Sequence, residues 1–247
     1  MSDERRSTER FASRAGAYAA FRPSYPGEAV DAALAGLGEP GRLVVAALGA
    51  GTGISARLFA ERGARVIALE PNAAMRAAAT PHPRIEWRAG TAEETHLPDQ
   101  SVDLVTACQA FHWFATPRAL AEFARIARRR AAILQYERDE RDDFTKAYGD
   151  VVRAHARDDT EALRRAALDV FAGFPGARVA RAEFASKQRL DLAGLLGRAS
   201  SASYLPDGGP ELARLQADLR TAFERHQRGG FVDLATVTFA LVADLVA

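Results

Sequence analysis

The sequence predicts an α/β protein built on an open, mostly parallel sheet with an antiparallel edge and helices on both faces. Three observations support this prediction. Apolar runs of strand length alternate with amphipathic helical patterns between residues 44 and 135, which is typical of parallel sheets. A glycine-rich turn follows the first of these runs directly. Two further strand-like runs come late in the chain, after a helical stretch, and are expected to form the antiparallel edge.

The predicted elements begin before the first strand. Tyr18 and Phe21 lie at helical spacing in a helix that should end before Pro23, because the residue preceding a proline disfavours helical backbone. A second helix begins at Pro26 and ends in the glycine-rich segment 36–41. The strands expected next are 44–48, 65–69, 85–88, 102–108 and 131–135, and the helices between them are 54–60, 72–79 and 117–128.

The pattern changes after Glu137. Residues 138–143 form a charged linker, and residues 144–172 predict one or two helices, interpreted as an insertion over the mouth of a pocket. Two strands (178–189 and 231–242), a helix (192–204) and an apolar stripe of core residues (Leu212, Leu215, Leu219 and Phe223) are expected later. The predicted division is a lid segment (1–26), a ligand-binding core (27–137), a helical insertion (138–175) and a C-terminal part that completes the sheet (176–247).

Composition limits the class of protein. The chain has 247 residues, 48% of them hydrophobic, so it can bury a full core as one domain. Its net charge of +1 gives no overall attraction to nucleic acid, and Arg128–Arg130 are expected in solvent at a helix end. A single cysteine excludes a disulfide framework. Because no apolar run approaches about 18 residues, we expect a soluble, cytoplasmic protein without membrane contact, either a monomer or a weak homodimer.

The most informative segment is the turn Gly49-Ala50-Gly51-Thr52-Gly53, which follows the strand 44–48. Glu70 ends the next strand, where a carboxylate can accept both hydroxyls of a ribose. A dinucleotide fingerprint would need glycine at position 54, but this chain has Ile54. The pattern therefore favours a nucleoside ligand without a pyrophosphate, which indicates S-adenosylmethionine (SAM).

Three further segments extend the pattern: Gly90–Asp99 followed by Ser101–Val105, Ala107–Phe114, and Tyr18–Pro26. Together with the glycine turn, this chain resembles the class I SAM-dependent methyltransferases with a Rossmann-like sheet. It is most similar to the small-molecule type represented by the trans-aconitate methyltransferase group. The resemblance is strong over roughly residues 10 to 136, because four motifs occur in the right order.

The resemblance implies a cofactor site. The backbone of Gly49, Ala50 and Gly51 would lie against the methionine part of SAM, and Glu70 would bind the ribose. The remaining cofactor residues that it implies are Pro71, Asn72, Met75, Thr91, Ala92, Glu93 and Gln109, most of them around the adenine. Relatives usually have a carboxylate where this chain has Ala47, so the contact that it makes to the cofactor ammonium is missing here.

The candidate catalytic residues are His112, Tyr18 and Arg22. His112 follows the fourth strand, where ligands bind in open α/β sheets, and three roles remain open for it: general base, substrate orientation or a structural histidine. Tyr18 and Arg22 on the lid are candidates to contact the cofactor carboxylate or an acidic substrate; otherwise they are a packing tyrosine and a surface arginine.

The expected acceptor is a small molecule. Methyltransferases that act on adenine or amide nitrogen commonly have an acidic or amide residue, two prolines and an aromatic residue where this chain has Gln109–His112. Two alternatives to methyl transfer remain: alkyl transfer or cyclisation that releases methylthioadenosine, and a SAM-binding protein without catalysis.

Overall fold

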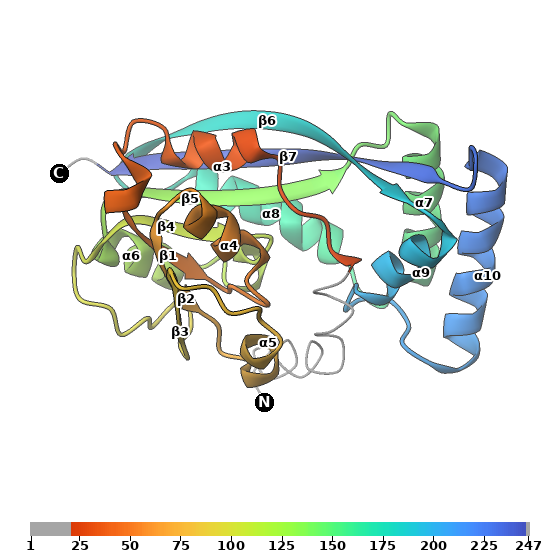
Figure 1. The fold of residues 1–247 in the computed structure, drawn as a ribbon, viewed down its shortest axis with the longest axis horizontal. Helices are drawn as coiled ribbons and strands as arrows, with labels where there is room; N and C mark the ends of the chain where they lie inside the picture. The colour runs from red at the N-terminus through yellow and green to blue at the C-terminus, as the bar shows by residue number, and fades with distance from the viewer. Residues whose placement is uncertain (1–20, 246–247) are drawn as a thin grey trace.

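The computed structural model describes residues 21–245, and one seven-stranded sheet runs through them in the order β3-β2-β1-β4-β5-β7-β6 (Figure 1). The strands are β1 (Val44–Leu48), β2 (Arg65–Leu69), β3 (Ile85–Arg88), β4 (Val102–Cys108), β5 (Ala127–Arg138), β6 (Ala177–Leu190) and β7 (Val232–Leu245). Strands β1 to β5 are parallel, and β7 runs antiparallel to both β5 and β6. The predicted fold class is therefore confirmed.

Helices cover both faces of the sheet. They are α3 (Gly27–Leu34), α4 (Ile54–Glu61), α5 (Ala73–Ala77), α6 (Pro117–Ile126), α7 (Asp143–His155), α8 (Thr160–Ala172), α9 (Leu192–Ser200) and α10 (Gly209–His226). In β1, Ala46 and Leu48 pack in a core shared with α6 and α8, whereas Val45 and Ala47 pack in a core shared with α3 and α4. Because both faces are buried, the central strands are continuously apolar.

A third core lies where β6 and β7 extend beyond the parallel strands. Helices α7, α9 and α10, here called the helical lobe, pack around Phe144, Leu195 and Leu219 (Figure 1). The predicted apolar stripe of α10 is confirmed as core. Helix α8 packs instead on the sheet, where Phe171 is fully buried. Residues 138–175, which were expected to form one helical insertion, thus contribute to two cores.

The prediction for Arg128–Arg130 was right about the exposure of Arg128 and Arg129 but wrong about the helix end and about Arg130. Helix α6 ends at Ile126, and these arginines lie at the start of strand β5. Arg130 is buried, pairs with Asp244 at 2.7 Å and donates to the backbone oxygens of Ala33 (3.0 Å) and Ala35 (2.6 Å). The last carbonyls of a helix lack partners within it and attract cations, so the run stabilises the end of α3 instead of α6.

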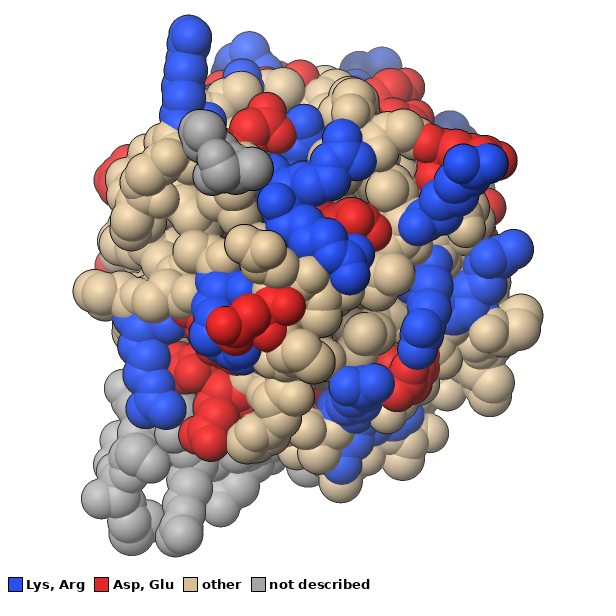
Figure 2. Space-filling model, turned by 90° about the vertical axis from the view of Figure 1, so that its left-hand side faces the viewer, with Lys and Arg blue, Asp and Glu red and all other residues tan. Residues whose placement is uncertain are grey.

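Two surface observations accompany the fold. Within residues 21–245, no helix combines the length and apolar character needed to cross a membrane. On the end of the molecule opposite the helical lobe, basic and acidic side chains are interspersed without a large patch of one sign (Figure 2).

Candidate functional site

The glycine turn has a left-handed backbone conformation, which residues with a side chain rarely adopt. Gly49, Gly51 and Gly53 have φ angles of 60°, 59° and 88°. A Cβ at Gly49 would lie 2.8 Å from the Cβ of Ala110, and one at Gly53 would lie 2.9 Å from the ring of Trp87. The turn follows β1 and lies beside the carboxyl ends of β2 and β4. Open parallel sheets bind their ligands at this end of the strands.

Gly49→Ala is expected to lower the free energy of unfolding by about 2–5 kcal/mol. About 1–2 kcal/mol comes from left-handed backbone, and overpacking against Ala110 adds about 1–3 kcal/mol. Gly36 is a matched control, because its φ is 77° but nothing lies within 4 Å of an added Cβ. Denaturant unfolding should show the smaller loss for Gly36→Ala, and equal losses would contradict the close approach of Gly49 to its neighbours.

Glu70 connects the glycine turn to the segment that follows β2. Its carboxylate is buried, and its two oxygens accept hydrogen bonds from the backbone nitrogens of Gly51 and Asn72, each at 2.9 Å. Burial raises the pKa of Glu70, while these two hydrogen bonds and the charge of Arg76 oppose that rise. A carboxylate has about four acceptor positions, so Glu70 can hold both backbone groups and still accept ribose hydroxyls.

The residues expected around an adenine lie in two segments, one at the start of the short helix α5 and one after β3. The side chain of Asn72 caps this helix by accepting from the nitrogens of Ala74 (2.9 Å) and Met75 (3.2 Å). Met75 and Ala92 are buried, Thr91 and Glu93 are half-buried, and Pro71 is exposed. The structure thus gives Asn72 a structural role, and the adenine contacts of this group remain predictions.

His112 lies in a turn of 3-10 helix directly after β4 and is buried. Neither of its ring nitrogens has a hydrogen-bond partner within the described part of the chain. Burial, followed by the charges of Arg164 and Arg22, keeps the pKa of His112 well below its usual range. The side chain is therefore a neutral imidazole with one donor and one acceptor available to an occupant of the site.

Arg22 joins the N-terminal segment to the helical lobe and to β5. It donates to the hydroxyl of Tyr136 at 3.2 Å and to the backbone oxygen of Ser201 at 3.1 Å. Tyr18, the other predicted lid residue, lies outside the described residues. The prediction that these two residues act on substrate or cofactor therefore stays a prediction.

The side chain of Gln109 has a structural role. Its amide accepts from the backbone nitrogen of Tyr136 (2.9 Å) and donates to the backbone oxygen of the same residue (3.1 Å), which joins the end of β4 to β5. Its φ of 52° is unusual for a residue other than glycine. The backbone nitrogen of Gln109 donates to the backbone oxygen of Leu134 at 2.8 Å, and a cofactor contact by Gln109 remains a prediction.

Sequence reasoning missed Tyr136, Arg164 and Arg198. Tyr136 is buried, and Arg198 lies over its ring at 5.7 Å. Burial would raise the pKa of Tyr136, but the charges of Arg22, Arg198 and Arg164 lower it to about 8. These residues come from β5, α8 and α9, and nothing in their local sequence indicates that they meet.

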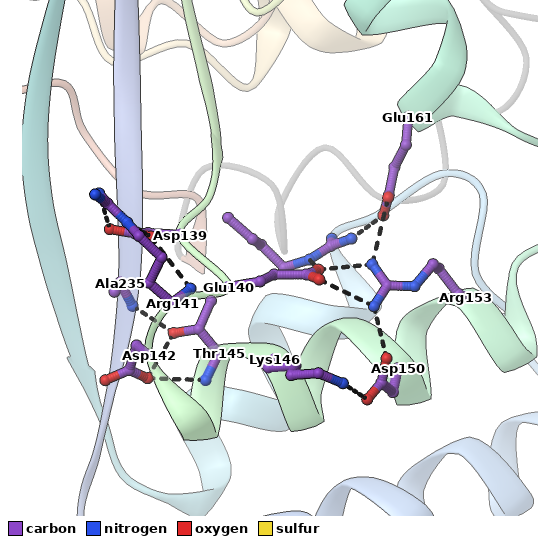
Figure 3. Close-up of polar contacts among 11 residues, drawn as sticks. Asp139, Glu140, Arg141, Asp142, Thr145, Lys146, Asp150, Arg153, Glu161 and Ala235 are labelled. Carbon is purple, nitrogen blue, oxygen red and sulfur yellow. Dashed lines mark hydrogen bonds and ion pairs between the residues drawn. The ribbon is translucent and has the colours of Figure 1, made fainter.

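Two hollows adjoin these residues. A small cavity at the glycine turn is lined by Arg22, Pro23, Tyr25, Gly49, Ala50, Ile54, Ser55, Cys108 and Tyr136. A larger depression is lined by Glu137, Arg138, Glu140, Arg153, Glu161, Arg164 and Arg165. In its wall, Arg153 pairs with Glu140 (2.6 Å) and Asp150 (2.7 Å), and it also lies near Glu161 (Figure 3). Tyr136 thus borders the cavity at the turn, and Arg164 borders the depression between α7 and α8.

Comparisons with known proteins agree with this arrangement. Residues 46–134 match the family described as a methyltransferase domain. An uncharacterised methyltransferase of Mycobacterium tuberculosis is 40% identical over 148 residues, 58% of each chain, so the match spans less than two thirds of that relative. An uncharacterised methyltransferase of Schizosaccharomyces pombe is 26% identical over 93% of this chain and 94% of its own.

Solved structures share the fold. A protein from Anaeromyxobacter dehalogenans, described as a type II methyltransferase, superposes with a TM-score of 0.63 at 23% identity and covers 91% of this chain and 97% of its own. A protein from Anabaena variabilis, described as a methyltransferase of an antibiotic biosynthesis pathway, gives 0.59 at 24% identity over 80% and 90%. At these identities the likeness concerns the fold.

Proposed function

We propose that this chain, which contains a methyltransferase domain at residues 46–134, transfers a methyl group from SAM to a small-molecule acceptor. The observation that carries the proposal is the juxtaposition at one edge of the sheet. The glycine turn and the buried carboxylate of Glu70 lie after β1 and β2, and the neutral imidazole of His112 lies after β4.

The residues at the turn fit SAM. Gly49 and Gly51, whose φ angles are positive, have no side chain, so a ligand can approach their backbone closely. Glu70 retains acceptor positions for a ribose, and the buried side chain of Met75 suits an adenine ring. When bound, SAM supplies a sulfonium methyl that is already activated toward nucleophiles.

The protein's part in the reaction is then to position the acceptor and exclude water. His112, buried and neutral, can accept a hydrogen bond or a proton from the acceptor nucleophile, or donate one to orient it. So low a pKa favours orientation of the acceptor over proton transfer as the role of His112, because proton transfer is most efficient when the pKa of the base lies near the working pH.

The burial of this region supports a small acceptor. His112, Tyr136 and Tyr204 are all buried, which suits a compact molecule better than a polymer. We further propose that the chain is similar to the trans-aconitate methyltransferase group and that nucleic acid is not its substrate. Its working form is a monomer or a weak homodimer.

Turnover with SAM and a panel of small acceptors tests the proposal, with both products identified by mass. We expect S-adenosylhomocysteine and an acceptor heavier by one methyl group, in equal amounts. Methylthioadenosine in place of S-adenosylhomocysteine would indicate alkyl transfer or cyclisation instead. SAM binding without any product across the panel would favour the non-catalytic alternative.

A further inference from the structure

Tyr136 is buried at the end of β5 and lines the cavity at the glycine turn, together with Gly49 and Ala50. Its hydroxyl accepts a hydrogen bond at 3.2 Å from Arg22, which lines the same cavity. The side chain of Gln109 binds the backbone of Tyr136 at its nitrogen (2.9 Å) and its oxygen (3.1 Å). Both the backbone and the hydroxyl of this tyrosine are therefore fixed in place.

Tyr136 is also a stronger acid than an ordinary tyrosine. Burial would raise its pKa, but the charges of Arg22, Arg198 and Arg164 and the hydrogen bond from Arg22 lower it to about 8. Cys108, whose thiol lines the same cavity, shows the opposite effect, because burial raises its pKa to about 11. Near neutral pH, Tyr136 therefore supplies a negative charge to this cavity far more readily than Cys108 does.

The cavity lacks a carboxylate among the described residues that line it. The amino-acid part of SAM, which the proposed function places at this turn, carries both a carboxylate and an ammonium group. Arg22 is the cation of the cavity wall and suits the carboxylate. A buried ammonium group needs an acceptor, because burying an unpaired charge is costly. The phenol oxygen of Tyr136 can supply that acceptor together with a negative charge.

The position of Tyr136 relative to Ala47 supports the same assignment. Ala47 on β1 pairs with Thr106 on β4, which pairs with Ala132 on β5. Alternate residues of a strand lie on one face of the sheet, so Tyr136 shares the face of Ala132 and Ala47, and all three belong to one core. The resemblance implies a carboxylate at position 47, and this chain has an acidic phenol on the same face instead.

We propose that Tyr136 binds the ammonium group of SAM through its phenol oxygen, an assignment that rests on the proposed function. The hydrogen bond from Arg22 to this oxygen stabilises the phenolate, and a bound ammonium group stabilises it further. Binding should therefore lower the pKa of Tyr136 below about 8, and its proton should pass to solvent at neutral pH.

Calorimetric titration with three adenosine derivatives tests this contact. They are S-adenosylhomocysteine, its analogue without the amino group, and methylthioadenosine, which lacks the whole amino-acid part. Wild type should bind S-adenosylhomocysteine about 10- to 100-fold more tightly than the deaminated analogue, the effect of one charged hydrogen bond. Tyr136→Phe should remove this difference by weakening S-adenosylhomocysteine, and its affinity for methylthioadenosine should equal that of wild type.

Tyr148→Phe is the matched control. Tyr148 is also buried, but it lies on α7 in the helical lobe and is not among the residues that line this cavity. This variant should keep the preference for S-adenosylhomocysteine over the deaminated analogue. Equal affinity of wild type for these two compounds would overturn the proposal. A Tyr136→Phe protein that loses affinity for methylthioadenosine as strongly as for S-adenosylhomocysteine would also overturn it, because the tyrosine would then have only a structural role.

The proton released on binding gives a readout that depends on no variant. At pH 7, Tyr136 is mostly a phenol, because its pKa is about 8. Binding of S-adenosylhomocysteine should convert it to the phenolate, which absorbs at longer wavelength than the phenol and the adenine ring. The ultraviolet difference spectrum should show this band with S-adenosylhomocysteine and lack it with the deaminated analogue. Binding of S-adenosylhomocysteine without the band would overturn the proposal.

The other groups around Tyr136 do not produce this signal. The three arginines keep their charge throughout this range, and the raised pKa of Cys108 keeps it a thiol. Tyr25 is the other phenol at the cavity, with its ring centre 5.8 Å from that of Tyr136, so loss of the band in Tyr136→Phe assigns the signal. A wild-type chain that binds none of the three compounds would contradict the proposed function, and this contact with it.

Discussion

Glu70→Ala is expected to weaken SAM binding by about 10²- to 10⁴-fold. Two hydrogen bonds from ribose hydroxyls to a carboxylate contribute about 1.5–3 kcal/mol each, and about 1.4 kcal/mol corresponds to a factor of ten. The alanine also removes the acceptor that holds the backbone nitrogens of Gly51 and Asn72, so the two turns lose their common anchor. Calorimetric titration with SAM measures the loss.

Glu70→Gln separates the two roles of this side chain. Glutamine keeps the shape and one acceptor oxygen but loses the charge, so its SAM affinity should lie between those of wild type and alanine. Thermal unfolding should show which variant also loosens the turns. SAM affinity equal to wild type in a folded Glu70→Ala protein would remove the ribose assignment and with it most of the proposed cofactor site.

The sign of the pH effect at Glu70 follows from its environment. Burial raises the pKa of its carboxyl, so protonation begins at a higher pH than for an exposed glutamate. Ribose hydroxyls donate to the ionised form, and SAM affinity should therefore fall as the solution is acidified through that raised pKa. The Glu70→Gln variant should lack this limb.

His112→Ala is expected to lower the turnover rate by about 10²- to 10⁴-fold if the imidazole takes a proton from the acceptor. If the imidazole only orients the acceptor, KM should rise more than kcat falls, and His112→Asn should restore part of the loss by keeping a hydrogen bond. SAM affinity should change little in either case, because His112 follows β4, whereas the glycine turn and Glu70 proposed for the cofactor follow β1 and β2.

His96→Asn is the control for this series, since His96 is exposed and asparagine tolerates its φ of 56°. Steady-state kinetics with the best acceptor of the panel compare the variants. A folded His112→Ala protein that no longer binds SAM would make His112 a cofactor residue, and unchanged kcat and KM would make it a structural one.

The sheet could be predicted because its signals are local. The apolar runs of β1, β2 and β4 are each continuous, the glycines follow β1 directly, and Glu70 follows β2 directly. Parallel strands end at the same edge, so these segments also predicted which residues meet there. The start of β5 was missed because Arg128–Arg130 resemble a solvated helix end. Their partners lie far away in the sequence, in β4, at and just beyond the end of α3, and in β7.

The proximity of Tyr136, Arg164 and Arg198 could not be predicted in this way. Tyr136 lies just beyond the predicted strand 131–135, and the two arginines belong to different helices, α8 and α9. Their proximity depends on how these helices are placed relative to the end of β5. Such contacts are long-range, and composition or periodicity carries no signal for them.

The most direct test of the whole account is the crystal structure of the chain with S-adenosylhomocysteine. The account predicts the ribose hydroxyls within hydrogen-bond distance of Glu70 and the amino-acid part along Gly49–Gly51. The sulfur should face His112. Ordered S-adenosylhomocysteine away from the ends of β1 and β2, or with its sulfur turned from His112, would contradict these assignments.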